Sequence, residues 1–177
     1  MNFIKTKLKD CIIIEPEIFS DSRGFFLETY SYKKYANTLN LESEFVQDNH
    51  SFSKKNVLRG LHYQKNRPQG KLVRVLSGEV FDVAVDLRED SNTFGEHFSI
   101  ILSGENKKQL WVPPGFAHGF MVISDEAHFE YKCTAYYDQS DERCIIWNDP
   151  DININWPQPM PILSKKDALG DNLANLF

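Results

Sequence analysis

The sequence contains little cysteine, and no pair of cysteines is spaced to form a structural metal site. Its three cysteines, Cys11, Cys133 and Cys144, lie far apart, and no C-x-x-C motif is present. An odd number of widely spaced cysteines is not typical of a small disulfide-bonded domain or of a zinc ribbon. We therefore expect reduced, buried thiols.

The sequence also lacks an excess of positive charge. Lysine and arginine together number 20, aspartate and glutamate number 25, and the net charge is −5. Proteins that bind nucleic acid usually carry a basic excess, which neutralises phosphate groups. Nucleic acid is therefore not expected as a partner.

Long hydrophobic runs are missing as well. The N-terminal stretch MNFIKTKLKDCIIIEPEIF has only four consecutive apolar residues before Glu15. A signal peptide needs an apolar stretch of about 7–15 residues, and a transmembrane helix needs about 18 or more. We expect a soluble, cytoplasmic protein that does not associate with a membrane.

No internal repeat, low-complexity tract or Pro/Gly/Ser-rich linker divides the chain. Its 177 residues suit one domain and are enough to enclose a hydrophobic core. With 41% hydrophobic residues, the composition is that of a folded globular protein rather than a disordered one. We predict a single domain over residues 1–177.

What is present is a series of short strands. The segment 73–90 predicts two strands on either side of Ser77-Gly78, with Asp82 and Asp86 on the face opposite an apolar row. Segments 98–106 and 128–137 each predict a further strand, and 109–124 predicts two that are separated by Pro113-Pro114-Gly115. Many short antiparallel strands at close spacing are typical of a sandwich or a barrel.

Helices are expected at only two places. Apolar residues recur at helical spacing between Ser31 and Leu41. Near the other end of the chain, Ser164 and Asp167 have the spacing of a capping box, which predicts a short helix after Ser164.

A group of polar residues interrupts strands that are otherwise apolar. His62 and Gln64 share one face of a predicted strand, Arg59 lies at its start, and Lys71 and Arg74 follow in the next strand. A single histidine in a strand is usually structural, but the polar and charged residues close to His62 favour a functional site. Lys71 opens an apolar run, so its stem should be buried while its ammonium group has a specific partner.

Three further motifs allow two interpretations each. His118 follows the Pro-Pro-Gly turn and either caps a neighbouring carbonyl or faces a ligand. Arg23 lies in a Ser-Arg-Gly turn, which is either a solvated hairpin tip or part of a site. Gln47 and Asn49 share a strand face and suit either a carbonyl-rich ligand or a buried hydrogen-bond network.

The histidines do not match a metal site of the cupin type. Such sites often have a His-x-His pair, a nearby glutamate and a later histidine after a Pro-x-Gly turn. Here His118 matches the last piece, but His62-Tyr63-Gln64 supplies one imidazole and no carboxylate occurs between His62 and Gly78. Two histidines alone are a poor set for iron or zinc. Metal-free chemistry is the better interpretation, with a neutral histidine as base, a tyrosine as acid and lysine or arginine as electrostatic partners.

With these residues assembled, the chain resembles the dTDP-4-dehydrorhamnose 3,5-epimerase (RmlC) family. The resemblance extends from position 19 to position 167. It is carried by F-x-D-x-R-G (19–24), Q-D-N-x-S (47–51), R-G-L-H-x-Q (59–64), K-L-V (71–73), D-V-A-V-D-L-R (82–88), P-x-G-F-A-H-G-F (113–120), W-N-D-P (147–150) and Lys166-Asp167. Several long motifs in the right order make it a specific match.

The resemblance implies a mostly β fold, a cupin-type jelly-roll barrel of antiparallel strands with a few short helices. It implies a homodimer with exchanged N-terminal strands, and neither a cofactor nor a metal. The implied reaction converts dTDP-4-dehydro-6-deoxy-D-glucose to dTDP-4-dehydro-L-rhamnose, a step of dTDP-L-rhamnose biosynthesis. That pathway supplies surface polysaccharide such as the O-antigen of lipopolysaccharide.

The resemblance also implies a set of site residues. His62 matches the family's catalytic base, Asp167 the aspartate that orients it, Lys71 the lysine at the sugar's carbonyl oxygen, and Tyr131 the tyrosine on the opposite face of the ring. The substrate-binding positions of the family fall on Arg23, Glu28, Gln47, Asn49, Arg59, His118, Glu142 and Lys166.

Other functions remain open at this point. Relatives on the same scaffold epimerise one carbon or move the ketone, and Tyr131 followed by Lys132-Cys133-Thr134 favours the double epimerase. A metal-dependent oxygenase is disfavoured by Gln64. A sugar-binding protein without catalytic activity would leave His62 and Lys71 without a role.

Overall fold

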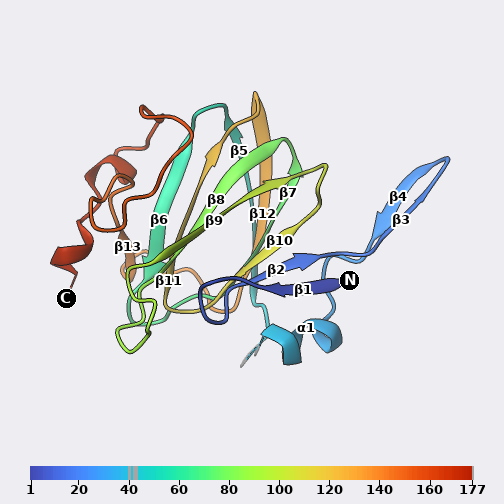
Figure 1. Ribbon diagram of the computed structural model, residues 1–177, viewed down its shortest axis with the longest axis horizontal. Helices are drawn as coiled ribbons and strands as arrows, with labels where there is room; N and C mark the ends of the chain where they lie inside the picture. The colour runs from blue at the N-terminus through green and yellow to red at the C-terminus, as the bar shows by residue number, and fades with distance from the viewer. Residues whose placement is uncertain (40, 42–43, 177) are drawn as a thin grey trace.

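Antiparallel strands make up most of the regular secondary structure in a computed structural model, which describes residues 1–39, 41 and 44–176 (Figure 1). The larger sheet has six strands in the order β1-β2-β10-β7-β12-β5. Their bounds are β1 Asn2–Lys5, β2 Ile12–Glu15, β10 Gln109–Val112, β7 Lys71–Ser77, β12 Glu126–Cys133 and β5 Gln47–Lys54. Each neighbouring pair in this sheet is antiparallel.

A second sheet has five strands in the order β13-β6-β11-β8-β9. Their bounds are β13 Glu142–Cys144, β6 Leu58–Gln64, β11 Phe116–Val122, β8 Glu79–Asp86 and β9 His97–Ser103. The predicted turn at Ser77-Gly78 joins β7 of the first sheet to β8 of the second. Gly78 has φ +81°, and a Cβ at this position would lie 2.0 Å from the carbonyl oxygen of Glu126, so the turn requires glycine.

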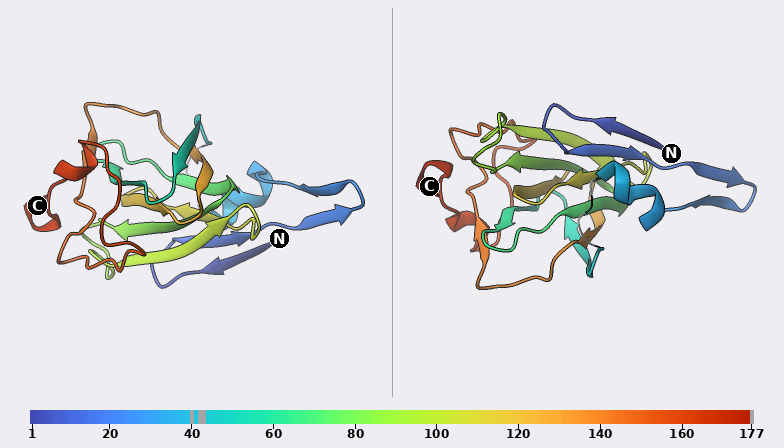
Figure 2. Two further views of the ribbon diagram at one scale, coloured as in Figure 1. Left: turned by 90° about the horizontal axis from the view of Figure 1, so that it is seen from above. Right: turned by 90° about the horizontal axis from the view of Figure 1, so that it is seen from below.

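The two sheets face each other across the main hydrophobic core (Figure 2). Val73 and Phe129 of the six-stranded sheet pack there against Val80, Leu102 and others of the five-stranded sheet. The mostly β prediction of a jelly-roll barrel is confirmed, and the strands expected on either side of Pro113-Pro114-Gly115 are β10 and β11.

Side chains on the outer face of the six-stranded sheet are covered by the one α-helix among the described residues. Helix α1 spans Tyr32–Leu39 and buries Tyr35 and Leu39 against Ile14 and Trp111. The helix predicted over 31–41 is therefore confirmed as a shorter one, while position 40 of that prediction lies outside the residues that the structure describes.

The outer face of the five-stranded sheet is covered by the C-terminal segment, which contributes Ile152, Trp156 and Leu173. Two short 3-10 helices lie in this segment, η1 at Asp167–Leu169 and η2 at Leu173–Asn175. The capping-box spacing correctly indicated η1, since the backbone N–H of Asp167 donates to Ser164 Oγ over 3.1 Å.

A two-stranded hairpin extends away from both sheets (Figures 1 and 2). It consists of β3, Ile18–Asp21, and β4, Gly24–Leu27, with Arg23 in its turn. Within this chain Phe19, Phe25 and Phe26 are 56%, 60% and 69% exposed.

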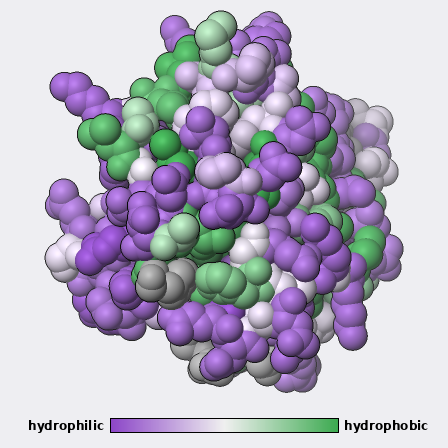
Figure 3. All heavy atoms as spheres, turned by 60° about the vertical axis from the view of Figure 1, so that its left-hand side comes forward, coloured by the Kyte–Doolittle hydropathy of each residue, from purple (hydrophilic) through white to green (hydrophobic). Residues whose placement is uncertain are grey.

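The face of the molecule drawn in Figure 3 is largely hydrophilic, with hydrophobic residues in small separate groups. Among the helices described, none is both long and apolar enough to cross a membrane.

Candidate active site

The candidate site is a cavity of about 240 Å³ between the two sheets. Two-residue periodicity explains its lining, because alternate side chains of each strand point into the barrel. The cavity is lined by Ser51, Arg59, His62, Lys71, His118, Gly119, Phe120, Phe129, Tyr131, Tyr137, Glu142 and Lys166. Most of the site residues expected from the sequence therefore meet in one place.

His62 sits at the middle of one wall. In the register of the five-stranded sheet it lies opposite His118 on one neighbouring strand and opposite Cys144 on the other. Its Nε2 is 2.5 Å from Oδ1 of Asp167, which comes from η1 and lies behind His62 rather than in the cavity lining. Thus two segments separated by 105 positions bring the predicted base and its aspartate together.

Asp167 is buried, with 3% of its surface exposed, and its carboxylate is held at both oxygens. Ser164 Oγ donates to Oδ2 over 2.8 Å, and His62 occupies Oδ1. Burial opposes ionisation of Asp167, but these two hydrogen bonds together with the charges of His62 and Lys166 outweigh it, so the pKa of Asp167 lies below its usual value. An ionised Asp167 accepts the Nε2 proton of His62 and leaves Nδ1 of the ring with its lone pair.

Lys71 is a buried amine on β7, in the sheet opposite His62. Its Nζ donates to the backbone oxygen of His62 over 3.3 Å, and the residue is 8% exposed. Burial lowers the pKa of Lys71, while the nearby Cys133, Glu142 and Asp82 act in the other direction. The expectation of a buried stem with a specifically placed ammonium group is confirmed.

Tyr131 lies on β12, also in the sheet opposite His62. It shares the inner face of that strand with Phe129 and Cys133, as the alternation predicts. Burial raises the pKa of Tyr131 to about 12, so the phenol is protonated at neutral pH. The cavity thus has an imidazole in one sheet and a phenol in the other.

His118 is neither in a turn nor bonded to a carbonyl, so the capping interpretation is wrong. It belongs to β11, is 7% exposed, and its Nε2 is 3.1 and 3.0 Å from the two carboxylate oxygens of Asp82. Asp82 is fully buried. The sequence analysis assigned no role to Asp82. The available signal was a carboxylate on the face of β8 opposite its apolar row.

The mouth of the cavity is charged. Lys166 Nζ lies 2.8 Å from Glu142 Oε2, and the hydroxyl of Tyr137 donates to the same oxygen over 3.0 Å. Arg59 donates to Ser53 Oγ over 2.9 Å and to the carbonyl of Phe52. The arginine and lysine side chains at the rim place positive charge at the entrance, where it can pair with phosphate oxygens.

Gln47 and Asn49 lie beside the cavity on β5 but do not line it. Gln47 Nε2 donates to Asn49 Oδ1 over 3.0 Å, and Gln47 Oε1 accepts the backbone N–H of Tyr137 over 2.9 Å. In this chain the pair therefore forms a hydrogen-bond network that holds the segment carrying Tyr137, one of the two roles that the sequence allowed.

Arg23 and Glu28 are not brought to the cavity by their own chain. Arg23 lies at the hairpin turn with 88% of its side chain exposed and pairs with Asp21, while Glu28 pairs with Lys34 at 2.9 Å. Motif matching alone gave no sign of this separation, because it places residues in sequence order and not in space.

A metal site of the cupin type is not formed at the expected positions. Gln64, which stands where a second histidine would be needed, uses its amide to hold the carbonyl of Arg67 and the N–H of Asp138. A different group of possible ligand atoms, those of His62, Cys144 and Asp167, lies within 4.8 Å of one another.

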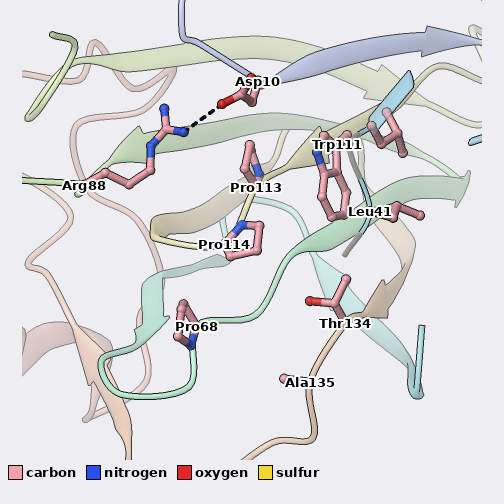
Figure 4. A pocket seen from close by; sticks show the side chains of 10 residues that line it. Asp10, Leu41, Pro68, Arg88, Trp111, Pro113, Pro114, Thr134 and Ala135 are labelled. Carbon is pink, nitrogen blue, oxygen red and sulfur yellow. Dashed lines mark hydrogen bonds and ion pairs between the residues drawn. The ribbon is translucent and has the colours of Figure 1, made fainter. Parts of the chain in front are cut away.

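A larger cavity of about 400 Å³ lies elsewhere and contains none of the predicted site residues (Figure 4). Proline rings and Trp111 make up much of its wall, and Asp10 and Arg88 form an ion pair of 3.0 Å at one end. It lacks the convergent imidazole, phenol and amine that distinguish the candidate site.

The comparisons with known proteins point to one family. The family model described as dTDP-4-dehydrorhamnose 3,5-epimerase matches residues 5–175. The chain belongs to the dTDP-4-dehydrorhamnose 3,5-epimerase family. One curated relative of that description, from Shigella flexneri, is 54% identical over 176 residues, which are 99% of this chain and 97% of the relative.

Solved structures of this family match over almost the whole chain. The RmlC structure from Legionella pneumophila, in complex with dTDP-4-keto-L-rhamnose, has a TM-score of 0.97 at 52% identity and covers 99% of this chain and 94% of that one. ChmJ from Streptomyces bikiniensis, a 3'-monoepimerase in complex with dTDP-quinovose, has a TM-score of 0.90 at 29% identity, covering 97% and 87%. The fold therefore serves both single and double epimerases.

Proposed function

We propose that this chain is a dTDP-4-dehydrorhamnose 3,5-epimerase that converts dTDP-4-dehydro-6-deoxy-D-glucose to dTDP-4-dehydro-L-rhamnose. One domain over residues 1–177 carries this activity. The observation that supports it best is the placement of His62 and Tyr131 in opposite sheets of one cavity. Inversion at carbon requires a base on one face of the sugar and an acid on the other.

The chemistry begins at the C4 ketone of the substrate, which acidifies the hydrogens on C3 and C5. His62 takes each proton at Nδ1. Asp167 keeps the imidazole in this tautomer and stabilises the imidazolium that forms, as the aspartate does in a Ser-His-Asp triad. Proton transfer by a positioned side chain contributes about 10²–10⁴-fold to the rate.

The enolate that results carries its charge on the C4 oxygen. Lys71 is placed to stabilise that charge, because its ammonium group lies in a buried wall where electrostatic interactions are less screened than in water. Tyr131 then delivers a proton to the opposite face of the carbanion carbon. A phenol that remains protonated at neutral pH suits this role.

The rim residues would hold the nucleotide. Arg59, His118 and Lys166 supply donors for the diphosphate oxygens, and Glu142 supplies a hydrogen-bonding group for the rest of the substrate. The Gln47–Asn49 pair would act beside them by holding the segment that carries Tyr137. Asp82 would keep the ring of His118 oriented.

Arg23 and Glu28 enter the proposal through a second copy of the chain. We propose a homodimer with exchanged N-terminal strands, in which the hairpin β3–β4 of one protomer reaches the cavity of its partner. Three exposed phenylalanines on a hairpin that extends away from both sheets support this, because such a surface usually marks an interaction site. We further propose cytoplasmic synthesis of dTDP-L-rhamnose for surface polysaccharide.

The function is tested by incubating purified protein with dTDP-4-dehydro-6-deoxy-D-glucose and a downstream 4-ketoreductase. The expected product is dTDP-L-rhamnose, identified by NMR, and His62→Ala should yield none. A product inverted at a single carbon would favour the alternative, a mono-epimerase, which ChmJ represents among the similar structures. Recovery of the ketone at another ring carbon would instead indicate a ketoisomerase.

The dimer is tested by complementation between two inactive variants. His62→Ala and Arg23→Ala are unfolded together and refolded as a mixture. If the partner's hairpin completes each site, half of the dimers are mixed and each has one intact site, so about a quarter of the wild-type activity returns. No return of activity, with mixed dimers verified by mass, would contradict the exchange.

A further inference from the structure

A thiol lies beside the His62–Asp167 pair and has no part in the proposed reaction. Cys144 is on β13, and the register of the sheet places it directly opposite His62. Side chains opposite each other in an antiparallel pair share one face and have Cβ atoms about 4.5–5.5 Å apart. The Sγ atom of Cys144 is 4.0 Å from Oδ1 of Asp167, the same oxygen that faces His62 Nε2.

Three different ligand types therefore converge on one point. An imidazole nitrogen, a thiol sulfur and a carboxylate oxygen lie within 4.8 Å of one another, and they come from β6, β13 and η1. This set is typical of zinc, cobalt or cadmium and not of magnesium or calcium, which prefer oxygen ligands alone. We propose that His62, Cys144 and Asp167 form an inhibitory binding site for a thiophilic divalent cation.

The distances are close to those that a tetrahedral ion needs. With metal–nitrogen and metal–oxygen bonds of about 2.1 Å and a metal–sulfur bond of about 2.3 Å, tetrahedral edges are about 3.4 Å for N···O and about 3.6 Å for O···S. The present values are 2.5 Å and 4.0 Å. A shift of the His62 ring by about 1 Å, with a smaller closure at sulfur, would complete the site.

The surroundings favour a cation. Asp167 already has its second oxygen bonded to Ser164, the kind of outer contact that orients metal-binding carboxylates. Acidic Glu142 and Asp171 lie near the thiol, with Lys166 as the opposing charge. Exchange of one thiol proton for a divalent ion converts a site of charge −1 into a neutral one.

The inhibition follows from the tautomer of His62. Before binding, Nε2 carries a proton that it donates to Asp167, and Nδ1 is the base. The cation must bond to the lone pair of Nε2, so that proton moves to Nδ1 while the thiol proton goes to solvent. His62 remains neutral, but its nitrogen toward the cavity is then a donor and not an acceptor, so it no longer removes a proton from carbon.

Two consequences distinguish this site from adventitious metal binding. Because the cation binds sulfur as a thiolate, binding releases the thiol proton of Cys144. The apparent affinity should therefore rise about tenfold for each unit of pH. Nucleotide binding should persist in the metal-loaded protein, because the ion lies behind the wall and not at the rim.

Binding is tested without substrate, on the full chain carrying no histidine tag. Titration with Co²⁺ should give thiolate-to-cobalt charge-transfer absorption in the near ultraviolet and tetrahedral bands in the visible. Cys11→Ser is the matched control and should keep both, since Cys11 is a buried thiol elsewhere in the fold. Cys144→Ser and Cys144→Ala should lose the charge-transfer band. No band in the wild type, or an unchanged band in both Cys144 variants, would overturn the proposal.

Inhibition is measured next, and only this part rests on the proposed function. Zn²⁺ should suppress epimerisation, excess Mg²⁺ should not, and a chelator should restore the rate. In Cys144→Ser the inhibiting concentration of Zn²⁺ should rise at least about 100-fold, since loss of even an outer contact costs about 10–100-fold. Equal inhibition of wild type and Cys144→Ser would overturn the site. A protein that gives the cobalt band on titration but does not turn over the dTDP-sugar when free of metal would instead contradict the proposed function.

Discussion

Removal of the negative charge behind His62 should disable the base without removing it. In Asp167→Asn the imidazolium formed by proton abstraction loses its ionised partner, which now lies 2.5 Å from Nε2. The side chains of His62 and Asp167 are 24% and 4% exposed, so an effective dielectric constant of about 20 is appropriate. With charge centres about 4 Å apart, the lost interaction is about 4 kcal/mol.

That loss corresponds to about a 1,000-fold decrease in kcat. The amide can orient in two ways, because Ser164 Oγ contacts the second oxygen of Asp167 over 2.8 Å. If the amide oxygen faces His62, only the charge is lost. If the NH₂ group faces His62, it donates to Nε2 and forces the wrong tautomer, and the decrease approaches about 10⁴-fold, as in a hydrolase triad.

The assay is steady-state turnover of the dTDP-sugar, with calorimetric binding of dTDP as a check on the site. Ser164→Ala is the matched variant, because it removes a hydrogen bond to Asp167 but leaves the charge. It should cost no more than about tenfold, the equivalent of about 1.4 kcal/mol. Asp125→Asn, at an aspartate with 98% of its side chain exposed, controls for charge alone. A folded Asp167→Asn enzyme with kcat within tenfold of wild type would refute the reasoning.

Three other changes give distinct outcomes. Tyr131→Phe should lower epimerisation by about 100-fold or more while deuterium exchange from solvent falls much less, because abstraction by His62 survives; equal losses by NMR would remove Tyr131 as the acid. Lys71→Ala should lower kcat by about 100-fold or more. Because burial lowers the pKa of Lys71, wild-type activity should fall as the pH rises, with a midpoint below pH 10.5. A pH–rate profile flat to pH 10.5 would contradict a required ammonium group. Asp86→Asn should destabilise the fold by about 3 kcal/mol, since the carboxylate is fully buried and accepts from Arg88, Ser91 and Thr93. Hydrogen bonds outweigh burial and lower the pKa of Asp86. The difference in denaturant midpoint between wild type and Asp86→Asn should therefore be complete above pH 3.8 and shrink as the pH falls through the lowered pKa. A difference that persists at low pH would show another cause.

Local patterns predicted the barrel well, because alternation along each strand specifies which side chains face inward. The row containing Phe129, Tyr131 and Cys133 and the turn at Ser77-Gly78 followed from spacing alone. The same rule places Lys71 and His62 on inner faces. It did not show that Asp82 would be buried against His118, since both faces of β8 are covered and polar residues on a strand are usually read as solvent-facing.

The arrangement of the site depended on contacts that sequence patterns do not encode. Asp167 meets His62 across 105 positions, and only the resemblance to a family linked them beforehand. Arg23 matched a binding motif yet lies on an extended hairpin, because a motif records the order of residues and not their positions in space. Cys144 gave no signal as an isolated cysteine, and its position opposite His62 emerged only from the strand register.

The central claim, that one histidine deprotonates two carbons and a tyrosine reprotonates them, is tested most directly by proton exchange in deuterated water. The protein is given dTDP-4-dehydro-6-deoxy-D-glucose, and the sugar is followed by NMR, with His62→Ala alongside. Deuterium should enter at both C3 and C5 with the wild type and at neither carbon with His62→Ala. Deuterium at only one carbon, or equal exchange in the two proteins, would contradict the account.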